Sequence, residues 1–308
     1  MGSFIAILNT ALPVLVALCL GMLCRKTGFL DRHGVDSLKK VVIQIALPAV
    51  LFDAFATAEY SLATVAISVL IFALCSGGLV LGKLVAKLFR MNSRLAPFLA
   101  TGFEAGMLGY AMFLLLFPEK SLSEFAVLDI GHTLFVFTLY KMLLSGKTDW
   151  RAMGKDMVTT PVLWAVVLGV LTGATGLYGF LEKAGVSAVV DSITSFVGAP
   201  TAMIILLTVG YDLVLGEIPW KKTIGLIVMR LVIMALLFAV AVLLNRTLLN
   251  NAMFEGAILL MCILPPPYVV PVFADEPAER VQVSASLSAL TLISLILFTA
   301  CSVLLRFI

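Results

Sequence analysis

The sequence predicts an all-α membrane protein with ten transmembrane helices, arranged as two inverted five-helix repeats whose fourth and ninth helices are broken. Three observations lead to this prediction. Of the 308 residues, 61% are hydrophobic and only 13% are charged, whereas roughly a quarter of the residues in a soluble domain are charged. The chain contains ten apolar segments of spanning length. Two of these segments are interrupted at corresponding places in the two halves.

The spans follow one another with short connections. A transmembrane helix needs about 20 mostly apolar residues. The first segment follows only Met-Gly-Ser, without a basic region or a cleavage site, which favours a retained helix over a signal peptide. The longest polar stretch separates a first repeat at residues 1–150 from a second at residues 151–308. We expect spans at residues 4–24, 37–58, 62–89, 95–117, 122–145, 159–178, 187–213, 220–245, 254–274 and 281–306.

Basic residues predict the orientation, because cytoplasmic loops carry an excess of Lys and Arg. Sixteen of the 21 Lys and Arg residues lie in or beside the loops that follow the odd-numbered spans. Only Lys120, Lys183, Arg246 and Arg306 lie on the other side. This excess predicts that both termini lie outside the cytoplasmic membrane. Because each half has five spans, the second half is inverted relative to the first.

The two interruptions are residues 102–110, which are rich in glycine, and residues 263–271, which contain four prolines. A chain that leaves the helix at membrane depth frees amides and carbonyls, each of which costs several kcal/mol in hydrocarbon. Such breaks occur where they line a cavity, and a matched pair is typical of a transporter's substrate site. We therefore expect the two breaks to cross near the middle of the membrane.

Weak matches between the halves support an internal repeat. Pro48 and Pro200 each lie inside an apolar segment, the second of its half. Tyr110 and Tyr268 each follow a break. Because proline interrupts the helical hydrogen-bond ladder, Pro48, Pro200 and Pro271 are candidate hinges.

Three segments resemble motifs of a known family. Residues 44–52 read Gln-Ile-Ala-Leu-Pro-Ala-Val-Leu-Phe, residues 104–109 read Glu-Ala-Gly-Met-Leu-Gly, and residues 272–276 read Val-Phe-Ala-Asp-Glu. In their order and spacing these segments resemble the auxin efflux carrier family of secondary transporters, which includes bacterial malate and malonate carriers and plant PIN-type carriers. The resemblance covers essentially the whole chain. It implies scaffold and transport bundles, an X-shaped crossover of spans four and nine with an organic anion beside it, and a homodimer.

The chain departs from the family at three places. Glu104 stands where the family has its crossover asparagine, and Ala111 stands where a proline usually follows the glycine of span four. Val270 stands where the plant carriers have a crossover proline. The identity of the substrate and of the coupling ion is therefore not carried over from the family.

Glu104 is the main candidate residue. An ionisable group within a span is costly unless it is paired, hydrated or neutral. One interpretation is that Glu104 carries a coupling proton or binds sodium, and the other is that it is a structural hydrogen-bonding carboxyl. A carboxylate beside an anionic substrate favours ion coupling over direct substrate binding.

The remaining candidates at the breaks are glycines, prolines and tyrosines. Gly102, Gly106 and Gly109 allow close backbone approach and turning at the crossing, or serve ordinary helix packing. Three consecutive prolines, Pro265, Pro266 and Pro267, free backbone amides at half-helix ends that attract a carboxylate, or form a simple kink. Tyr110 and Tyr268 are candidates for donating a hydroxyl to the substrate, with packing as the alternative.

Polar residues in other spans complete the candidate site. Asp129 and His132 lie three residues apart, on one face of span five, where a buried pair would relay protons and an interfacial pair would be structural. Asp53 follows Pro48 and is expected to face the same cavity. Arg230 lies within span eight, where it is expected to pair with a carboxylate such as Asp212 or to extend to the interface.

The sequence thus predicts a secondary transporter that moves a small organic anion such as malate, malonate or an auxin-like acid, with protons or sodium as candidate coupling ions. A transporter-derived sensor or receptor and a channel are the alternatives. Nucleotide-binding and metalloenzyme motifs are absent from the sequence, so we expect no enzyme activity, cofactor, metal or nucleic-acid partner.

Overall fold

The computed structural model describes residues 2–89, 91, 93–146, 160–213, 220–274 and 276–304, and in these residues the regular structure is helical. The first half contains α1 (Gly2–Thr27), α2 (Arg32–Val41), η1 (Val42–Ala46), α3 (Leu47–Ala56), α4 (Leu62–Leu88), α5 (Ala96–Ala100), η2 (Ala105–Gly109), α6 (Tyr110–Leu116), α7 (Leu122–Phe135), η3 (Val136–Tyr140) and α8 (Lys141–Ser145). The second half contains α10 (Pro161–Ala174), α11 (Leu177–Lys183), α12 (Ser187–Gly198), α13 (Thr201–Asp212), α14 (Trp220–Leu248), α15 (Glu255–Ile263), η4 (Val270–Phe273) and α16 (Pro277–Leu304).

Helix lies in each of the ten predicted segments, but many of these segments are divided. Among the described residues, six helices are long and apolar enough to cross a membrane, and a seventh span results if α10 and α11, which bend by 68° at their junction, are one span. This result confirms an all-helical protein with several spans. The count of ten spans remains a prediction.

Several predictions fall on residues outside the described ranges. They concern the boundary between the halves at residues 150 and 151, one acidic residue of the last family motif, and basic residues that enter the orientation argument: Asp275, Arg90, Lys147, Arg151, Lys155 and Arg306.

Two helix pairs form the most extensive contacts between the halves. α1 packs along α13, and α10 packs along α3. The α1–α13 contact is close because glycines face backbone: a Cβ on Gly21 would lie 2.0 Å from Leu207 O, and one on Gly210 would lie 2.2 Å from Leu18 O. Small residues allow this approach between apolar helices. In both pairs the first span of one half packs on the second span of the other half.

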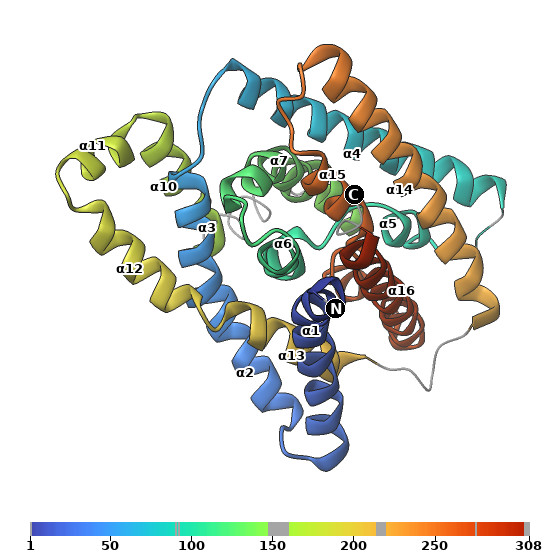
Figure 1. Ribbon diagram of the computed structural model, residues 1–308. Helices are drawn as coiled ribbons and strands as arrows, with labels where there is room; N and C mark the ends of the chain where they lie inside the picture. Colours follow the sequence, from blue (N-terminus) through green and yellow to red (C-terminus); the bar gives the residue numbers. More distant parts are fainter. Residues whose placement is uncertain are drawn as a thin grey trace.

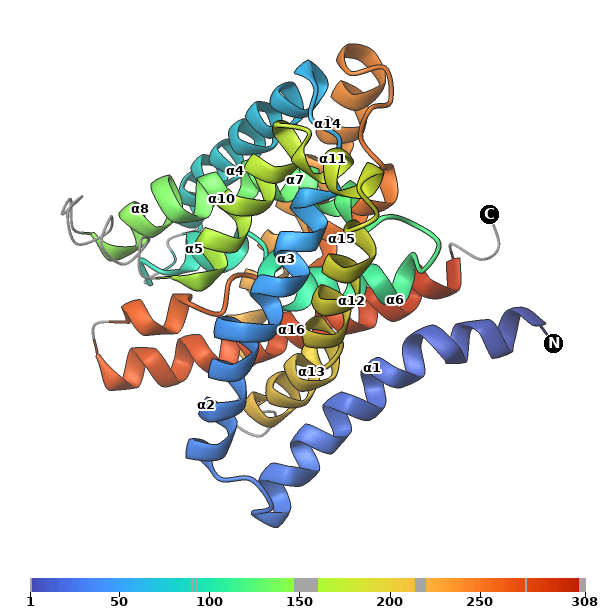
Figure 2. The same cartoon turned by 90° about the vertical axis from the view of Figure 1, so that its left-hand side faces the viewer.

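The helices form two groups with the broken segments between them. Figure 1 shows α3, α10 and α12 on one side of the molecule and α4 and α14 on the other, with α6, α7 and α15 near the centre. Figure 2, turned by 90°, shows α1, α12 and α13 together below α4 and α14. The central helices carry much of the core, including Tyr110, Phe113, Phe125 and Leu260, each of which is at most 1% exposed.

The predicted hinge prolines lie where helices change direction or type. Pro48 follows the π-helical turn η1, and Pro200 lies between α12 and α13. Pro271 lies in the short 3₁₀ turn η4, just after the second break. Each of these positions interrupts the regular α-helical hydrogen-bond pattern, as proline requires.

Candidate functional site at the crossing of the two breaks

The chain leaves the helix at both predicted breaks, and the two breaks touch. After α5, residues Thr101–Glu104 run without regular helix, and the helix resumes at Ala105. After α15, the chain is non-helical until Val270. The amide of Glu104 donates to the carbonyl of Pro265 at 2.8 Å, so backbone of one break bonds directly to backbone of the other.

Gly102 makes this crossing possible. Its φ is +71°, which lies in the left-handed region where a side chain is strained. A Cβ at this position would also lie 3.2 Å from Cδ of Pro267 and 3.1 Å from the ring of Tyr140. Both the conformation and the close approach therefore require glycine here.

The carboxylate of Glu104 accepts hydrogen bonds from both breaks. Oε1 accepts from the amide of Met107 at 3.3 Å, and Oε2 accepts from the amide of Tyr268 at 2.7 Å. The first amide belongs to the helix that resumes after the first break, and the second lies just after the three prolines. Such amides lack a helical partner, so the crossover is a place where backbone N–H groups bind a carboxylate.

Arg230 binds the opposite kind of backbone group. Its side chain on α14 is 4% exposed. It donates to the carbonyls of Leu99 at 3.2 Å, Gly102 at 2.9 Å and Leu264 at 2.6 Å. These carbonyls are freed where α5 and α15 end. The guanidinium thereby supplies hydrogen-bond donors to the free carbonyls of both breaks. Its planar set of N–H groups can donate to several acceptors at once.

The sequence-based expectation for Arg230 was wrong. The residue neither pairs with Asp212 nor extends to the interface, because its donors are taken by carbonyls from two broken helices. Asp212 instead accepts from Arg32 and Lys39. The signal was present: a charged residue within a span needs polar partners, and the two breaks supply unpaired carbonyls.

A second polar cluster lies behind Phe103. Asp129 accepts from the hydroxyl of Tyr110 at 3.0 Å and contacts Nδ1 of His132 at 3.0 Å. Asp129 and His132 are each 4% exposed, and the His132 ring lies 5.2 Å from that of Phe103. Nε2 of His132 has no hydrogen-bond partner among the described residues. The structure thus brings together three predicted site residues in a buried cluster.

A cavity of about 840 Å³ leads to the crossover. Glu104, Met107, Tyr268 and Pro271 line it. So do further residues from the ends of α1, α2, α13 and α16, which include the charged side chains Arg25, Arg32, Lys39, Asp212 and Arg280. Four basic residues against Asp212 and Glu104 give the lining a positive formal charge.

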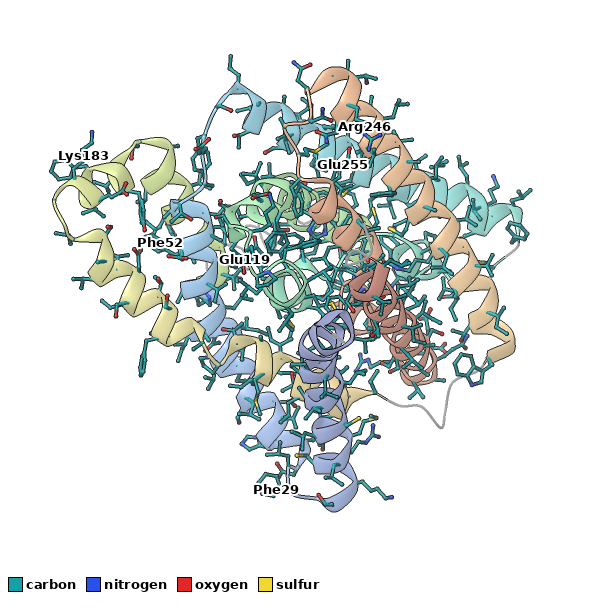
Figure 3. The ribbon with its side chains drawn as sticks, in the orientation of Figure 1. Phe29, Phe52, Glu119, Lys183, Arg246 and Glu255 are labelled. Atoms are coloured by element: carbon teal, nitrogen blue, oxygen red, sulfur yellow. The ribbon has the colours of Figure 1, made fainter. Side chains whose placement is uncertain are left out.

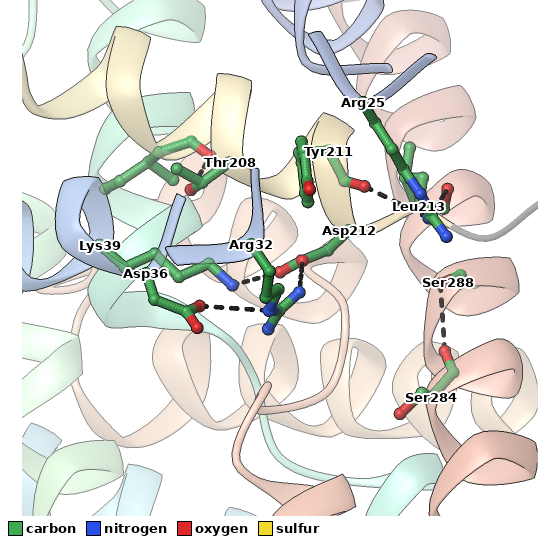
Figure 4. Close-up of polar contacts among 11 residues, drawn as sticks. Arg25, Arg32, Asp36, Lys39, Thr208, Tyr211, Asp212, Leu213, Ser284 and Ser288 are labelled. Carbon is green, nitrogen blue, oxygen red and sulfur yellow. Dashed lines mark hydrogen bonds and ion pairs between the residues drawn. The ribbon is translucent and has the colours of Figure 1, made fainter. Parts of the chain in front are cut away.

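The basic side chains are organised by the end of α13 (Figure 4). Asp212 accepts from Nη1 of Arg32 at 2.6 Å and also binds Lys39. Arg25 lies 3.4 Å from the carbonyls of both Tyr211 and Leu213. Arg32 also pairs with Asp36, whose carboxylate lies 3.4 Å from its Nε. The four basic residues of the lining thus face two carboxylates here, those of Asp36 and Asp212, and positive charge remains at the entrance of the cavity.

Comparison with known proteins agrees with this architecture. The profile of a family described as membrane transport protein matches residues 6–151. An uncharacterized transporter of Methanothermobacter thermautotrophicus is 30% identical over 207 residues, which cover 62% of this chain and 68% of that protein. The chain belongs to the membrane transport protein family, the auxin efflux carrier family. The resemblance seen in the sequence is thereby confirmed.

A second archaeal relative of this transporter points the same way. An uncharacterized transporter of Methanocaldococcus jannaschii is 24% identical over 215 residues, which cover 67% of this chain and 68% of that protein. This chain is therefore a multi-pass membrane transporter.

The far ends of α6 and α15 in this transporter carry an aromatic cluster and an ion pair. The ring of Phe117 lies 5.3 Å from that of Phe113 and 4.9 Å from that of Phe254. Arg246 and Glu255, which lie next to each other in Figure 3, form a bidentate ion pair in which Nε and Nη2 of Arg246 donate to Oε1 and Oε2 of Glu255 at 2.7 and 2.8 Å. The cavity therefore reaches the crossover from one end, while aromatic rings pack together and an exposed ion pair forms at the far ends of α6 and α15.

Several predicted residues of this transporter do not line the cavity, among them Tyr110, Asp129 and His132 of the buried cluster. Asp53 on α3 accepts from the hydroxyl of Thr194 on α12 at 3.1 Å and does not line the cavity. The expectation that Asp53 faces the cavity with Glu104 is not met, because its carboxylate is turned toward α12. Gly109 is buried against Phe125 and Leu264, whereas Gly106 faces open space.

Proposed function

We propose that this transporter is a secondary active carrier of a small organic anion, which binds at the crossing of the two breaks and moves by alternating access. The observation that carries the proposal is the pair of amides from Met107 and Tyr268. They already hold a carboxylate, that of Glu104, at the inner end of a cavity with a positive lining. A substrate carboxylate needs the same donors and the same field.

The difference between the two ends supports alternating access. The cavity gives access to the crossover from the side of Arg25, Arg32, Lys39 and Arg280, while the rings of Phe117 and Phe254 pack together on the other side, where they would form the closed gate. Rocking one group of helices against the other would exchange these two states. Pro48, Pro200 and Pro271 are the proposed hinges, since each lies at an interruption of the helical pattern.

The same reasoning extends to topology and assembly. The packing of α1 on α13 and of α10 on α3 supports two inverted five-span repeats, residues 1–150 and 151–308. In each pair, the first span of one half packs on the second span of the other half, as expected for related repeats. The basic cavity entrance supports a cytoplasmic location for that side, with both termini outside. A homodimer in the cytoplasmic membrane is proposed from the family alone.

The proposed substrate is a carboxylate such as malate, malonate or an auxin-like acid, with protons or sodium as the coupling ion. Glu104, which is partly exposed and lines the cavity at the crossover, is the first candidate for binding that ion, and the buried Asp129–His132 pair is the second. The proposal includes no catalytic step.

Tracer uptake by proteoliposomes tests this function. The purified protein is reconstituted and given radiolabelled malate, malonate and indole-3-acetate, with unlabelled anion inside to allow counterflow. A carrier shows saturable uptake that internal unlabelled anion accelerates. Flux that neither saturates nor shows counterflow indicates a channel, and binding without flux indicates a sensor; either result contradicts the proposal.

A further inference from the structure

The carboxylate of Glu104 is held in an unusual way for a charged group at this depth. Its two oxygens bind two backbone amides that are 161 residues apart in sequence, Met107 and Tyr268. Among the ion pairs of the described residues, none includes Glu104. The donors that stabilise its charge are therefore the amides themselves.

Most other charged and titratable groups around Glu104 are engaged elsewhere or lie at a distance. Arg230 on α14 is occupied by three carbonyls. His132 and Asp129 on α7 contact each other at 3.0 Å. Tyr140 of η3 donates its hydroxyl to the carbonyl of Phe98, whereas the buried hydroxyl of Tyr268 has no hydrogen-bond partner among the described residues. Across the cavity lie the charged residues that line it, Arg25, Arg32, Lys39, Asp212 and Arg280.

Two carboxylates cannot share this pair of amides. Like charges within a few Å of each other strongly disfavour their joint ionisation, and each amide has a single hydrogen to donate. A substrate carboxylate that reaches the inner end of the cavity therefore meets a site that Glu104 has filled.

We propose that Glu104 is a built-in competitor for the substrate carboxylate, and that uptake of a proton by Glu104 releases the amides of Met107 and Tyr268 to the substrate. This inference rests on the proposed function. The proton is delivered through the cavity by hydronium from the solvent, which is left as water, and it binds one carboxylate oxygen. That oxygen becomes a hydroxyl donor, which faces an amide donor unfavourably, so the neutral side chain no longer holds both amides. The open space beside Gly106 gives room for the rearrangement.

The competition couples the two ligands without any direct contact between them. Each anion binds together with one proton, so a monocarboxylate crosses without net charge and a dicarboxylate crosses with one negative charge. After the transporter opens on the other side, loss of the proton restores the Glu104 carboxylate, which displaces the substrate. Glu104 thus both binds the coupled proton and, after losing it, displaces the substrate from the amides.

Binding calorimetry in detergent tests the competition. Malonate and indole-3-acetate are titrated into wild type, Glu104→Gln and Glu104→Ala in buffers of different ionisation enthalpy, which gives the number of protons taken up per anion. Glu124→Gln is the matched control, since it makes the same change in a carboxylate that pairs with Lys120 away from the cavity. We expect about one proton per anion for wild type and control, with Kd rising about tenfold per pH unit where Glu104 is ionised. For both Glu104 variants we expect no proton uptake and a Kd independent of pH.

The outcomes separate the two proposals. Proton uptake that persists in Glu104→Gln and Glu104→Ala, or that is absent in wild type, overturns the competition and leaves the anion carrier intact. A dependence on sodium in place of the proton does the same. If no form binds either anion while all remain folded by circular dichroism, the proposed function fails, and the competition fails with it.

Discussion

The amide of Tyr268 lies 2.7 Å from Oε2 of Glu104, so the backbone of one broken segment binds the side chain of the other. Arg230 makes the complementary link through carbonyls of the same two segments. The carbonyls freed at the helix ends thus accept hydrogen bonds from Arg230, and the freed amides donate hydrogen bonds to the carboxylate of Glu104. In the proposed competition, protonation of Glu104 frees these amides for a substrate carboxylate, so the crossover contains one constant and one exchangeable link.

The constant link predicts a structural role for Arg230. Each buried carbonyl that loses its donor costs about 1–3 kcal/mol, so Arg230→Ala should lower the free energy of unfolding by several kcal/mol. Arg230→Lys should recover only part of the loss, since an ammonium lacks the planar fork. Equilibrium unfolding in mixed micelles measures both variants. Arg246→Ala, at an exposed pair, is the control and should leave the melting temperature unchanged. Wild-type stability of Arg230→Ala would show that the three hydrogen bonds contribute nothing.

Gly102 and Gly106 form a matched pair for testing the crossing. Gly102→Ala should destabilise the protein by about 1–3 kcal/mol, because the alanine is strained at positive φ and its Cβ presses on Pro267 and Tyr140. Gly106→Ala should be nearly neutral for stability, since no atom lies within 4 Å of its added Cβ. The melting temperatures of the two variants provide the comparison. Equal effects would mean that the breaks do not approach as described.

The pattern of the sequence was sufficient for some of this arrangement and insufficient for the rest. Apolar segments of spanning length located helix in every predicted region, and glycine and proline runs located both breaks, because these are local properties of the chain. The partner of Arg230 was missed because pairing was sought among charged side chains, whereas its partners are carbonyls that no residue letter reveals. Asp53 was expected in the cavity because it lies close to Pro48 in the sequence. In the structure it lies on the face of α3 that is turned toward Thr194.

The buried cluster of α7 predicts measurable coupling between Tyr110 and Asp129. Removing the hydroxyl in Tyr110→Phe should cost about 1 kcal/mol, the usual contribution of one hydrogen bond. In the double variant with Asp129→Asn the two effects should be non-additive by at least about 0.5 kcal/mol, because the residues are in contact. The free energies of unfolding of wild type, the two single variants and the double variant form the double-mutant cycle that measures this coupling. Strict additivity would argue against the Tyr110–Asp129 contact.

The charge of the cavity entrance predicts salt-dependent uptake. Arg32→Gln together with Lys39→Gln should raise KM for a carboxylate by about tenfold at low ionic strength, with less effect at high salt, because the lost field no longer concentrates anions. Lys183→Gln, an exposed lysine on α11 at the periphery of the molecule (Figure 3), should leave KM unchanged. Uptake kinetics in a series of salt concentrations measures these effects. An unchanged KM in the double variant would remove the entrance from the anion's path.

Accumulation driven by a pH gradient tests the central claim most directly. Proteoliposomes with an imposed inward proton gradient are given radiolabelled malonate or indole-3-acetate, and uptake is followed for wild type and Glu104→Gln. Wild type should accumulate the anion above equilibrium until a protonophore collapses the gradient, while Glu104→Gln should exchange anion across the membrane without accumulating it. Accumulation by Glu104→Gln equal to that of wild type, or no carrier-mediated flux of either carboxylate by wild type, would contradict the account.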